Sequence, residues 1–576
     1  MHLNKGLRGL RAAIAIGALL FAPLAAEAQD DGFDFGGDEG ASSGDGFDFG
    51  GDDSGGSGSS NAAPAEIDTS SAAYAKYTQA QGLIDAKQFL QAAEILNEAI
   101  SAGDDASFAM AAQLHYEMGR ALYEAGYYQS ALNHFEIVVQ QGSAYKEFDL
   151  ALPYLVLIGR VLPGEPNRYS RIYDNYLNKF PTEVSDNLLS ELGYLLGMAA
   201  YRENKLDDVV FFVGHVAEDS EFYGKSRYLE GVTYVRQNKG EEALASFKEV
   251  LRWLDAKSAN DKLTKDESRL REFTVAALGR VFYQVGSTLW KMGEREKAAK
   301  SWTTSIKYYN AFGRHNALWL ESLFEASWAY YRVDNFGKAL GLLLTLNSPF
   351  FNDKYYPEAM LLQATIYYTN CHYDRVVDIL GDYQATYSPL KTQVDTLVSR
   401  LFQPEEVYDF LHMVQTADKD SYDPTLQQVL EAAVQDRELM RGLAYIDMLD
   451  DETARVKESA IASTPLGQNM VQEIEAARML SVVEAGKKGK QRLERLQEEL
   501  RDLSNKALDI EIETTEKYAA RAELREQDPN AIAEFEQEID RVMGADDEHL
   551  FWTFDGEYWN DELGYYWYYI SSRCGR

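Results

Sequence analysis

The sequence predicts an all-α protein: a superhelical solenoid of stacked helical hairpins, followed by long C-terminal helices and a short aromatic β-hairpin. Three observations lead to this fold class. One hairpin pattern returns roughly every 34 to 41 residues from about Ala72 to Tyr387, helical apolar spacing continues to about Met543, and aromatic residues crowd the end of the chain. Because one hairpin cannot bury its apolar face alone, the copies must stack on one another.

The clearest copy of the hairpin pattern is Tyr116–Val138. There Gly119 lets the first helix pack close to its partner, and Gly126 forms the turn. Ala131 and the aromatic Phe135 then interlock the second helix with the first. Weaker copies contain Ala80, Gly197, Gly231, Gly286, Ala326 and Ala364 at the position of the small residue.

These residues resemble the tetratricopeptide repeat family across residues 69–390, a little over half of the chain. The resemblance implies a solenoid with a concave side that binds a protein partner. It leaves the count open at seven or eight, because Leu155–Phe180 is degenerate and contains helix-breaking Pro163 and Pro166. The stretch Trp319–Leu390 also resembles periplasmic envelope repeat proteins of predatory and gliding bacteria, which implies a role in an outer-membrane or motility assembly.

The resemblance also carries the family's concave-side positions onto residues of this chain. The resulting set is aromatic and locally basic, and exposed aromatic and Arg side chains are common anchors of peptide recognition. We expect some of the aromatic residues to fill the core between repeats instead. The predicted partner-binding residues are Tyr116, Arg120, Tyr123, Tyr228, Arg236, Tyr283, Trp290, Lys291, Trp328, Tyr331, Arg332 and Tyr368.

The chain opens with the pattern of a secretory signal peptide, residues 1–28. Basic residues precede the apolar stretch Ala12–Ala25, and Ala26-Glu27-Ala28 forms an A-x-A cleavage site. We therefore expect a periplasmic protein, with secretion as the second choice. An uncleaved anchor is the alternative, although the apolar stretch is short for a membrane span.

Residues 29–68 form an acidic linker rich in Gly and Ser, with eleven Asp or Glu and no Lys or Arg. Such a composition predicts disorder. One octapeptide occurs twice, at Asp31–Asp38 and Asp45–Asp52. It is either a solvated spacer, an aromatic-acidic docking motif or a calcium ligand. As a docking motif, residues 31–52 would bind the basic, aromatic groove of the same protein.

Two further regions follow the repeats. Residues 391–545 are predicted to be helical, with a coiled-coil-like segment at about 466–527 whose apolar seam suits either a dimer or a helix folded back on the solenoid. Residues 546–576 are predicted to form the aromatic β-hairpin, which either caps the core or presents aromatic rings to glycan or to another envelope protein. The seam consists of Leu493, Leu496, Leu500, Leu503, Ala507 and Ile510.

The composition excludes several function classes. A formal net charge of −36 argues against binding to nucleic acid or to an anionic membrane. The two cysteines, Cys371 and Cys574, form no disulfide framework, and whether they pair is left open. No phosphate loop, nucleophile elbow or metal-binding motif occurs, so we expect no enzyme, cofactor or metal.

The sequence thus predicts a non-catalytic periplasmic scaffold of the cell envelope that binds protein segments in its concave groove. Charge complementarity favours acidic and aromatic segments. The alternative is a glycan- or peptidoglycan-binding envelope protein that uses the aromatic tail.

Overall fold

The computed structural model describes residues 67–574 with several gaps, and every regular element in this part of the chain is a helix. The predicted signal peptide and both octapeptides lie outside the described residues. The chain divides into two compact units, each described here by itself. The gaps are 163–168, 170–171, 173–174, 178–184, 261, 352–353, 402, 417–425, 427–429, 431–436 and 528–555.

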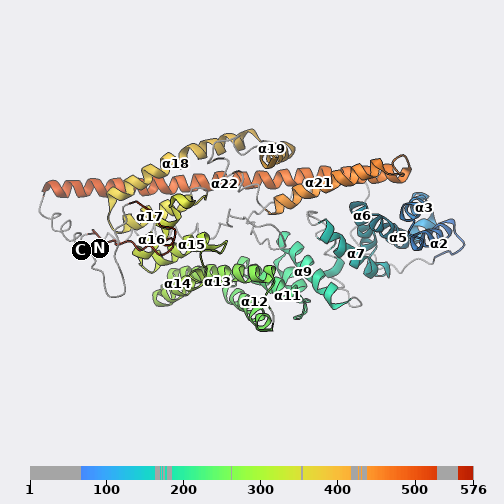
Figure 1. Cartoon of the computed structure of the whole chain (residues 1–576), viewed down its shortest axis with the longest axis horizontal. Coiled ribbons are helices and arrows are strands. Elements are labelled where there is room, and N and C mark those ends of the chain that lie inside the picture. The colour runs from blue at the N-terminus through green and yellow to red at the C-terminus, as the bar shows by residue number, and fades with distance from the viewer. Residues whose placement is uncertain are drawn as a thin grey trace. The chain divides into compact units, whose positions relative to one another are not determined.

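The N-terminal unit comprises the described residues within Phe33–Asp261 and Asp436–Lys488. It is a run of antiparallel helical hairpins, α2–α3, α5–α6, α9–α10 and α11–α12, joined by helices from late in the sequence (Figure 1). Its helices are α2 (Ala72–Asp85), α3 (Phe89–Ser101), α4 (Asp105–Ala109), α5 (Ala111–Glu124), α6 (Tyr128–Gln140), α7 (Glu147–Val161), α9 (Asp186–Arg202), α10 (Leu206–Val213), α11 (Tyr223–Arg236), α12 (Gly240–Asn260), α21 (Arg437–Glu458) and the first part of α22 (Pro465–Gln527).

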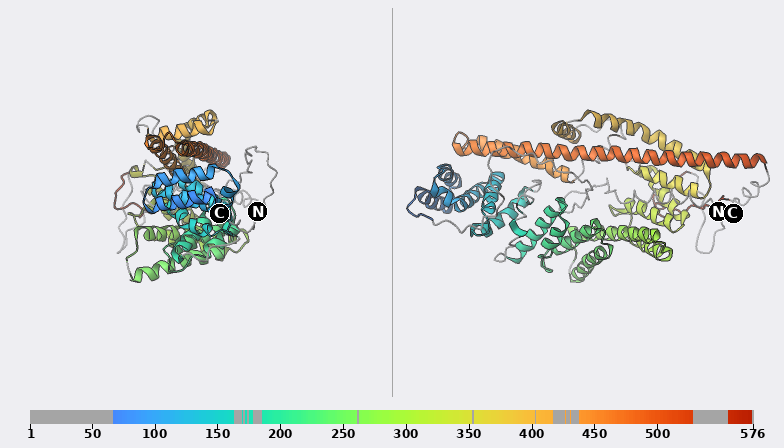
Figure 2. Two further views of the ribbon diagram at one scale, coloured as in Figure 1. Left: turned by 90° about the vertical axis from the view of Figure 1, so that its right-hand side faces the viewer. Right: turned by 180° about the vertical axis from the view of Figure 1, so that it is seen from behind.

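The C-terminal unit comprises the described residues of Lys262–Gln435 and Gly489–Arg576. It contains three more hairpins, α13–α14, α15–α16 and α17–α18, and α22 from Gly489 onward runs beside α17 and α18 (Figures 1 and 2). Its elements are α13 (Lys265–Lys291), α14 (Arg295–Tyr309), α15 (Trp319–Arg332), α16 (Phe336–Leu346), the 3-10 turn η2 (Pro349–Phe351), α17 (Pro357–Thr369), α18 (Tyr373–Arg400), α19 (Pro404–Thr416) and the rest of α22.

Three of the hairpins are held by a close contact between a glycine of the first helix and a ring of the second. A Cβ added to Gly119 would lie 2.9 Å from the ring of Phe135, and one added to Gly231 would lie 2.6 Å from that of Phe247. Gly286 meets the ring of Trp302 in the same way. These pairs share one sequence spacing, so the predicted interlock is confirmed as the repeating contact of an all-α solenoid like that of tetratricopeptide repeats.

The turn inside each hairpin places one residue in the left-handed backbone region. Gly126 and Gly293 have φ of 83° and 85° there, and Gly tolerates this region because it has no Cβ. Five copies instead place a non-glycine residue at this point, with φ between 57° and 61°. These residues are Lys87, Asn204, Asn238, Asp334 and Cys371.

The predicted aromatic β-hairpin is not formed by the described part of the tail. Asn560–Tyr565 makes a turn, but the expected second arm, Tyr565–Ile570, is not a strand, and most of the first arm lies outside the described residues. The second arm bonds to a helix instead, since the Tyr568 N–H donates to the Gly337 carbonyl of α16 at 3.0 Å. Leu563, 1% exposed, anchors the turn against Trp319.

A disulfide between Cys371 and Cys574 fixes the end of this tail, which settles the pairing that the sequence left open. Cys371 lies in the turn between α17 and α18. The Arg573 N–H also donates to the Asn370 carbonyl at 2.9 Å, so the tail is held covalently and by its backbone. Among the described helices, none combines the length and apolarity that a membrane crossing requires.

The glycine–ring contact predicts unequal effects of two Gly→Ala changes. Gly231→Ala should destabilise the protein by about 1–3 kcal/mol, because its Cβ would overlap Phe247. Gly82→Ala in α2, where no atom lies within 4 Å of the added Cβ, should be neutral or stabilising by up to about 1 kcal/mol. Urea unfolding of the two variants tests this, and equal effects would contradict the interlock.

Candidate partner-binding face

The side chains of α15 and α17 that contact α22 form one continuous surface, which we call the α22-binding face. Glu358, Leu361, Thr365 and Tyr368 recur at spacings of three and four along α17, so they share one side of the helix. Trp328 of α15 extends the surface, and a small pocket is lined by Trp328, Glu358, Leu361 and Thr365 together with two residues of α22.

The apolar seam of α22 lies on this face. Leu503, Ala507 and Ile510 are only 1%, 2% and 1% exposed and belong to the same buried cluster as Trp328 and Leu361. Earlier in α22, Leu496 and Leu500 are buried with Leu390 and Val394 of α18 in a second cluster. In the C-terminal unit, the seam therefore packs on the helices of its own chain.

Polar contacts surround the apolar seam. The Tyr368 hydroxyl donates to the Glu513 carboxylate at 2.9 Å. The Gln384 amide donates to Glu511 at 2.8 Å. Arg521 donates to the carbonyl of Cys371 at 3.0 Å, at the same turn that bears the disulfide. These contacts fix the position of α22 along α17 and α18.

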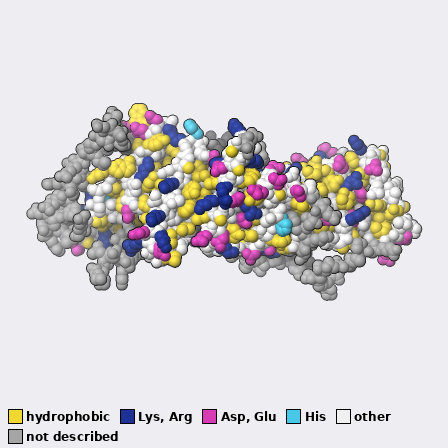
Figure 3. All heavy atoms as spheres, turned by 90° about the horizontal axis from the view of Figure 1, so that it is seen from below, with side chains coloured by type: hydrophobic (Ala, Val, Ile, Leu, Met, Phe, Trp, Pro, Cys, Tyr) yellow, Lys and Arg dark blue, Asp and Glu magenta, His cyan; other side chains and the backbone are white. Residues whose placement is uncertain are grey.

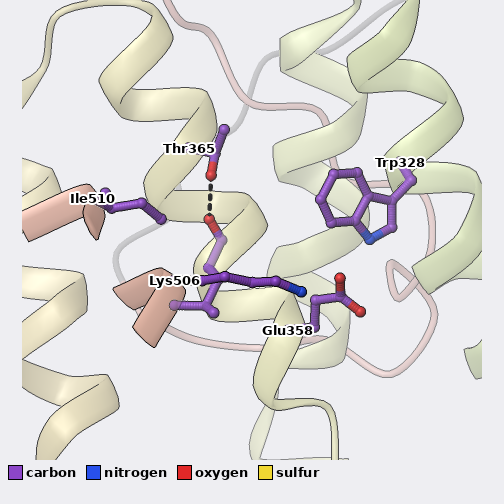
Figure 4. Close-up of a pocket in the computed structure, with 6 residues that line it drawn as sticks. Trp328, Glu358, Thr365, Lys506 and Ile510 are labelled. Carbon is purple, nitrogen blue, oxygen red and sulfur yellow. Dashed lines mark hydrogen bonds between the residues drawn. The ribbon is translucent and has the colours of Figure 1, made fainter. Parts of the chain in front are cut away.

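Two carboxyl groups lie at this contact, and each has an elevated pKa. Burial raises the pKa of Glu358, which is 5% exposed, to about 7, and the ammonium group of Lys506 opposes the rise. Burial also raises the pKa of Glu499 on α22 to about 8; the Glu358 charge adds to this rise, and Lys506 and Arg492 oppose it. Figure 4 shows the Lys506 side chain extending toward Glu358, with Trp328 nearby.

The structure places the twelve predicted partner-binding residues in both units and at different depths. Trp328 and Tyr368 belong to the α22-binding face, whereas Arg332 donates to the Tyr283 hydroxyl at 3.1 Å. Their role in binding a partner remains a prediction. Tyr228, Tyr283, Trp328, Tyr331 and Tyr368 are buried, Tyr116, Arg120, Tyr123, Arg236, Trp290 and Arg332 are half-buried, and Lys291 is exposed.

In the N-terminal unit, the predicted residues pack against neighbouring helices. The ring of Tyr154 on α7 lies 6.2 Å from that of Tyr116 and 5.3 Å from that of Tyr123. Arg120 pairs with Glu117 at 2.9 Å. The Arg236 guanidinium lies 4.6 Å from the centre of another ring, that of Tyr201 on α9. Here too, part of the aromatic set fills space between repeats.

Sequence reasoning missed Glu358, Leu361 and Thr365, which complete the α22-binding face. The signal that identifies them is their three-and-four spacing with Tyr368, the same spacing that the seam of α22 shows. They are neither aromatic nor basic, and these are the side-chain types by which the sequence marks anchors of peptide recognition. Glu358 is acidic, and Leu361 and Thr365 are ordinary helix residues.

A second contact with a C-terminal helix lies in the N-terminal unit. The buried Glu452 of α21 accepts hydrogen bonds from the N–H groups of Gln129 and Ser130, at 3.0 and 3.1 Å. These amides belong to the first turn of α6, which has no partner for them within its own helix. Arg455 donates to the Gly126 carbonyl at 2.9 Å. A carboxylate from α21 therefore caps α6.

The surface charges are mixed on the face that Figure 3 shows, where Lys and Arg side chains lie among Asp and Glu and among apolar side chains. The described residues contain no group of three or more His, Cys, Asp or Glu side chains arranged to hold a metal ion.

No protein-family model matches the chain, and no curated protein matches it. Among solved structures, the apo form of RapI is similar at 12% identity, covering 71% of this chain and 98% of its own, with a TM-score of 0.27. The TPR domain of P58(IPK) is 11% identical over 71% of this chain and 99% of its own, with a TM-score of 0.16. A circular tandem repeat protein is 12% identical over 76% and 90%, with a TM-score of 0.14. These scores are too low to support a functional inference, so the fold rests on the helix packing itself.

The elevated pKa values of Glu358 and Glu499 predict that docking of α22 weakens as pH rises. Both groups bind protons more tightly when α22 is docked, so the stabilisation is full below about pH 4.5 and is lost through about pH 7 to 8. Hydrogen exchange in residues 500–514, corrected for intrinsic rates, should accelerate across that range. Glu358→Gln with Glu499→Gln should flatten the dependence, whereas Glu498→Gln, an exposed neighbour, should leave it unchanged.

The cap on α6 predicts that Glu452→Ala destabilises the N-terminal unit by about 1–3 kcal/mol, because two buried N–H groups lose their acceptor. Exchange at the amides of Gln129 and Ser130 should rise. Asp451→Ala, which changes the exposed neighbour, is the matched control. The same loss of protection in both variants would show that the cap contributes nothing.

Proposed function

We propose that this protein is a non-catalytic protein–protein interaction scaffold of the periplasm, acting within an outer-membrane or motility assembly of the cell envelope. The observation that carries the proposal is a helical segment, α22, seated on the first helices of the C-terminal hairpins. A surface that buries one amphipathic helix has the apolar centre and polar rim that helix recognition requires. The predicted signal peptide of residues 1–28 supports export.

The partner protein would also contact those predicted partner-binding residues whose side chains are accessible to solvent. Lys291 is exposed, and Trp290 beside it is half-buried at the end of α13. Acidic and aromatic segments suit such a surface, because they pair with cations and pack on rings. Residues 31–52 of the same chain are acidic and aromatic, so the proposal includes binding of these residues to this surface.

Photo-crosslinking in the native cells tests the scaffold role. A photoreactive residue in place of Lys291 should capture protein partners, and mass spectrometry identifies them. The same residue in place of the exposed Lys300 of α14 is the control and should capture fewer. Identical products at the two positions, or a full-length chain that retains residues 1–28 in the cytoplasmic fraction, would contradict the proposal.

A second candidate function is glycan binding, and one observation favours it. The tail carries a row of large aromatic side chains that remain exposed although the tail itself is fixed by the disulfide. Aromatic faces of this kind can stack on sugar rings. The exposed fractions are 57% for Trp559, 74% for Tyr565, 55% for Trp567 and 48% for Tyr569.

Sedimentation with purified peptidoglycan separates the two functions. Changing Tyr565, Trp567 and Tyr569 together to Ala should leave Leu563 and the disulfide in place. If glycan binding is the function, the wild-type protein should sediment and this variant should stay in solution. If neither protein sediments, the scaffold function alone remains.

A further inference from the structure

We propose that the disulfide between Cys371 and Cys574 is a site of thiol–disulfide exchange with a dithiol reductant, and that its reduction releases residues 566–574 from α16. In the oxidised protein this segment is a strap across the helices of the C-terminal unit. In the reduced protein the strap is open. The switch goes beyond the proposed scaffold function and does not depend on it, because it involves only the tail and the helices beneath it.

The strap lies directly on the backbone of α16. A Cβ added to Gly337 would lie 2.6 Å from the Tyr568 carbonyl oxygen, and one added to Gly341 would overlap the carbonyl of Tyr566. The Tyr568 N–H donates to the Gly337 carbonyl at 3.0 Å. Only residues without a side chain permit so close an approach. The tail therefore covers a stretch of helix backbone that its release exposes.

The strap is anchored near its beginning by a turn that does not need the disulfide. Leu563 is only 1% exposed and packs with Trp319 of α15. The Gly564 N–H donates to the Thr345 hydroxyl at 2.9 Å, and the Lys338 ammonium donates to the Gly564 carbonyl at 3.2 Å. We expect these contacts to hold the turn whether or not the two cysteines are joined.

The far end of the strap depends more on the covalent bond. None of residues 565–574 is buried, so apolar burial adds little there. Hydrogen bonds that water can replace contribute little net stability. The polar contacts printed by the geometry at this end are Arg573 N–H to the Asn370 carbonyl at 2.9 Å, His372 Nε2–H to the Ser571 carbonyl at 2.7 Å, and the ion pair of Arg573 with Asp374 at 3.7 Å.

The surroundings of the disulfide favour attack on one of its two sulfurs. Both cysteines are half-buried, so a small dithiol can reach them. The Tyr373 hydroxyl donates to the Cys371 sulfur at 3.3 Å, which stabilises a thiolate there and makes Cys371 the better leaving group. The incoming thiolate therefore attacks the Cys574 sulfur. A new S–S bond forms at Cys574, the bond to Cys371 breaks, and Cys371 leaves as a thiolate.

The second thiol of the reductant completes the reaction. It displaces Cys574 from the mixed disulfide, so the reductant is oxidised to a disulfide and its two thiol protons pass to the two cysteines. Because the turn at Leu563 stays attached, Cys574 remains on a short tether near Cys371. A short tether gives an effective concentration of about a millimolar. An oxidant should therefore close the strap again without unfolding the protein.

Hydrogen exchange of the full chain, with and without dithiothreitol, tests the strap. Reduction should speed exchange at the Tyr568 and Arg573 amides about tenfold, since both leave their acceptors. The Gly564 amide and helices α16 and α17 should keep their protection. Unchanged exchange at Tyr568 and Arg573 would overturn the proposal, because noncovalent contacts would then suffice. Loss of protection throughout α16 and α17 would overturn it as well, because the disulfide would then brace the whole unit.

The double variant Cys371→Ser with Cys574→Ser is the matched control. It should show the exchange pattern of the reduced protein without any reductant, and dithiothreitol should change nothing. Brief treatment of the wild-type protein with glutathione, followed by acid quenching and mass spectrometry, locates the attacked sulfur. The adduct should lie on Cys574, and an adduct on Cys371 alone would contradict the assigned direction.

Recovery of the disulfide tests the anchoring turn. After dithiothreitol is removed, oxidised glutathione should restore the bond and the protection of the Tyr568 amide. Leu563→Asp, which removes the anchor but lies outside the helices, should recover several-fold more slowly, because its Cys574 is held by a longer tether. Equal recovery rates would show that the turn does not keep the open strap in place.

Discussion

The close contact of a small residue of the first helix with the second helix sets the geometry on which a hairpin depends, and in three hairpins it joins a glycine to a ring. Because Gly231 has no side chain, Phe247 can lie directly on the helix backbone, and the two helices come closer than any larger residue would permit. Helices this close need a tight turn between them. That turn requires one left-handed residue, and in the last hairpin this residue is Cys371.

Close packing within hairpins also decides which surfaces stay open. The second helix covers one side of the first, and the next hairpin covers another, so one face of each first helix remains. Along α17, the chain covers this face with its own α22. In the N-terminal unit, α21 contributes a carboxylate, that of Glu452, which caps the first turn of α6. The C-terminal helices therefore complete both units by apolar burial, and in the N-terminal unit a buried carboxylate cap is added to it.

The repeating contacts could be predicted from the sequence because they are local. Gly119 and Phe135 stand at a fixed spacing within one hairpin, and the stripe of Leu503, Ala507 and Ile510 marks a helix that must bury one side. What covers that stripe could not be predicted. A heptad seam suits a second copy as well as a solenoid, and only the three-dimensional arrangement brings Leu361 against it.

The functional residues were harder to predict than the fold. Aromatic residues at the family's concave positions serve two purposes that the sequence does not separate. Tyr283 is buried, whereas Trp290, about two turns further along the same side of α13, is half-buried. Glu358 is marked only by its helical spacing with Tyr368, because acidic residues are common throughout this chain. Its importance depends on Glu499, which lies far away in sequence. The prediction of a β-hairpin in the tail was wrong for a related reason. The Tyr568 N–H bonds to the carbonyl of Gly337, which is far away in sequence and which the local pattern cannot reveal.

The cap on α6 has a consequence for how the chain is made. Gln129 and Glu452 are 323 residues apart, so a ribosome releases the amide long before the carboxylate that accepts from it. At usual elongation rates, the delay is on the order of tens of seconds. During that interval, α6 begins without the acceptor for its first amides. A chain that stopped after α18 would consequently lack part of both units, and not merely an appendage at its end.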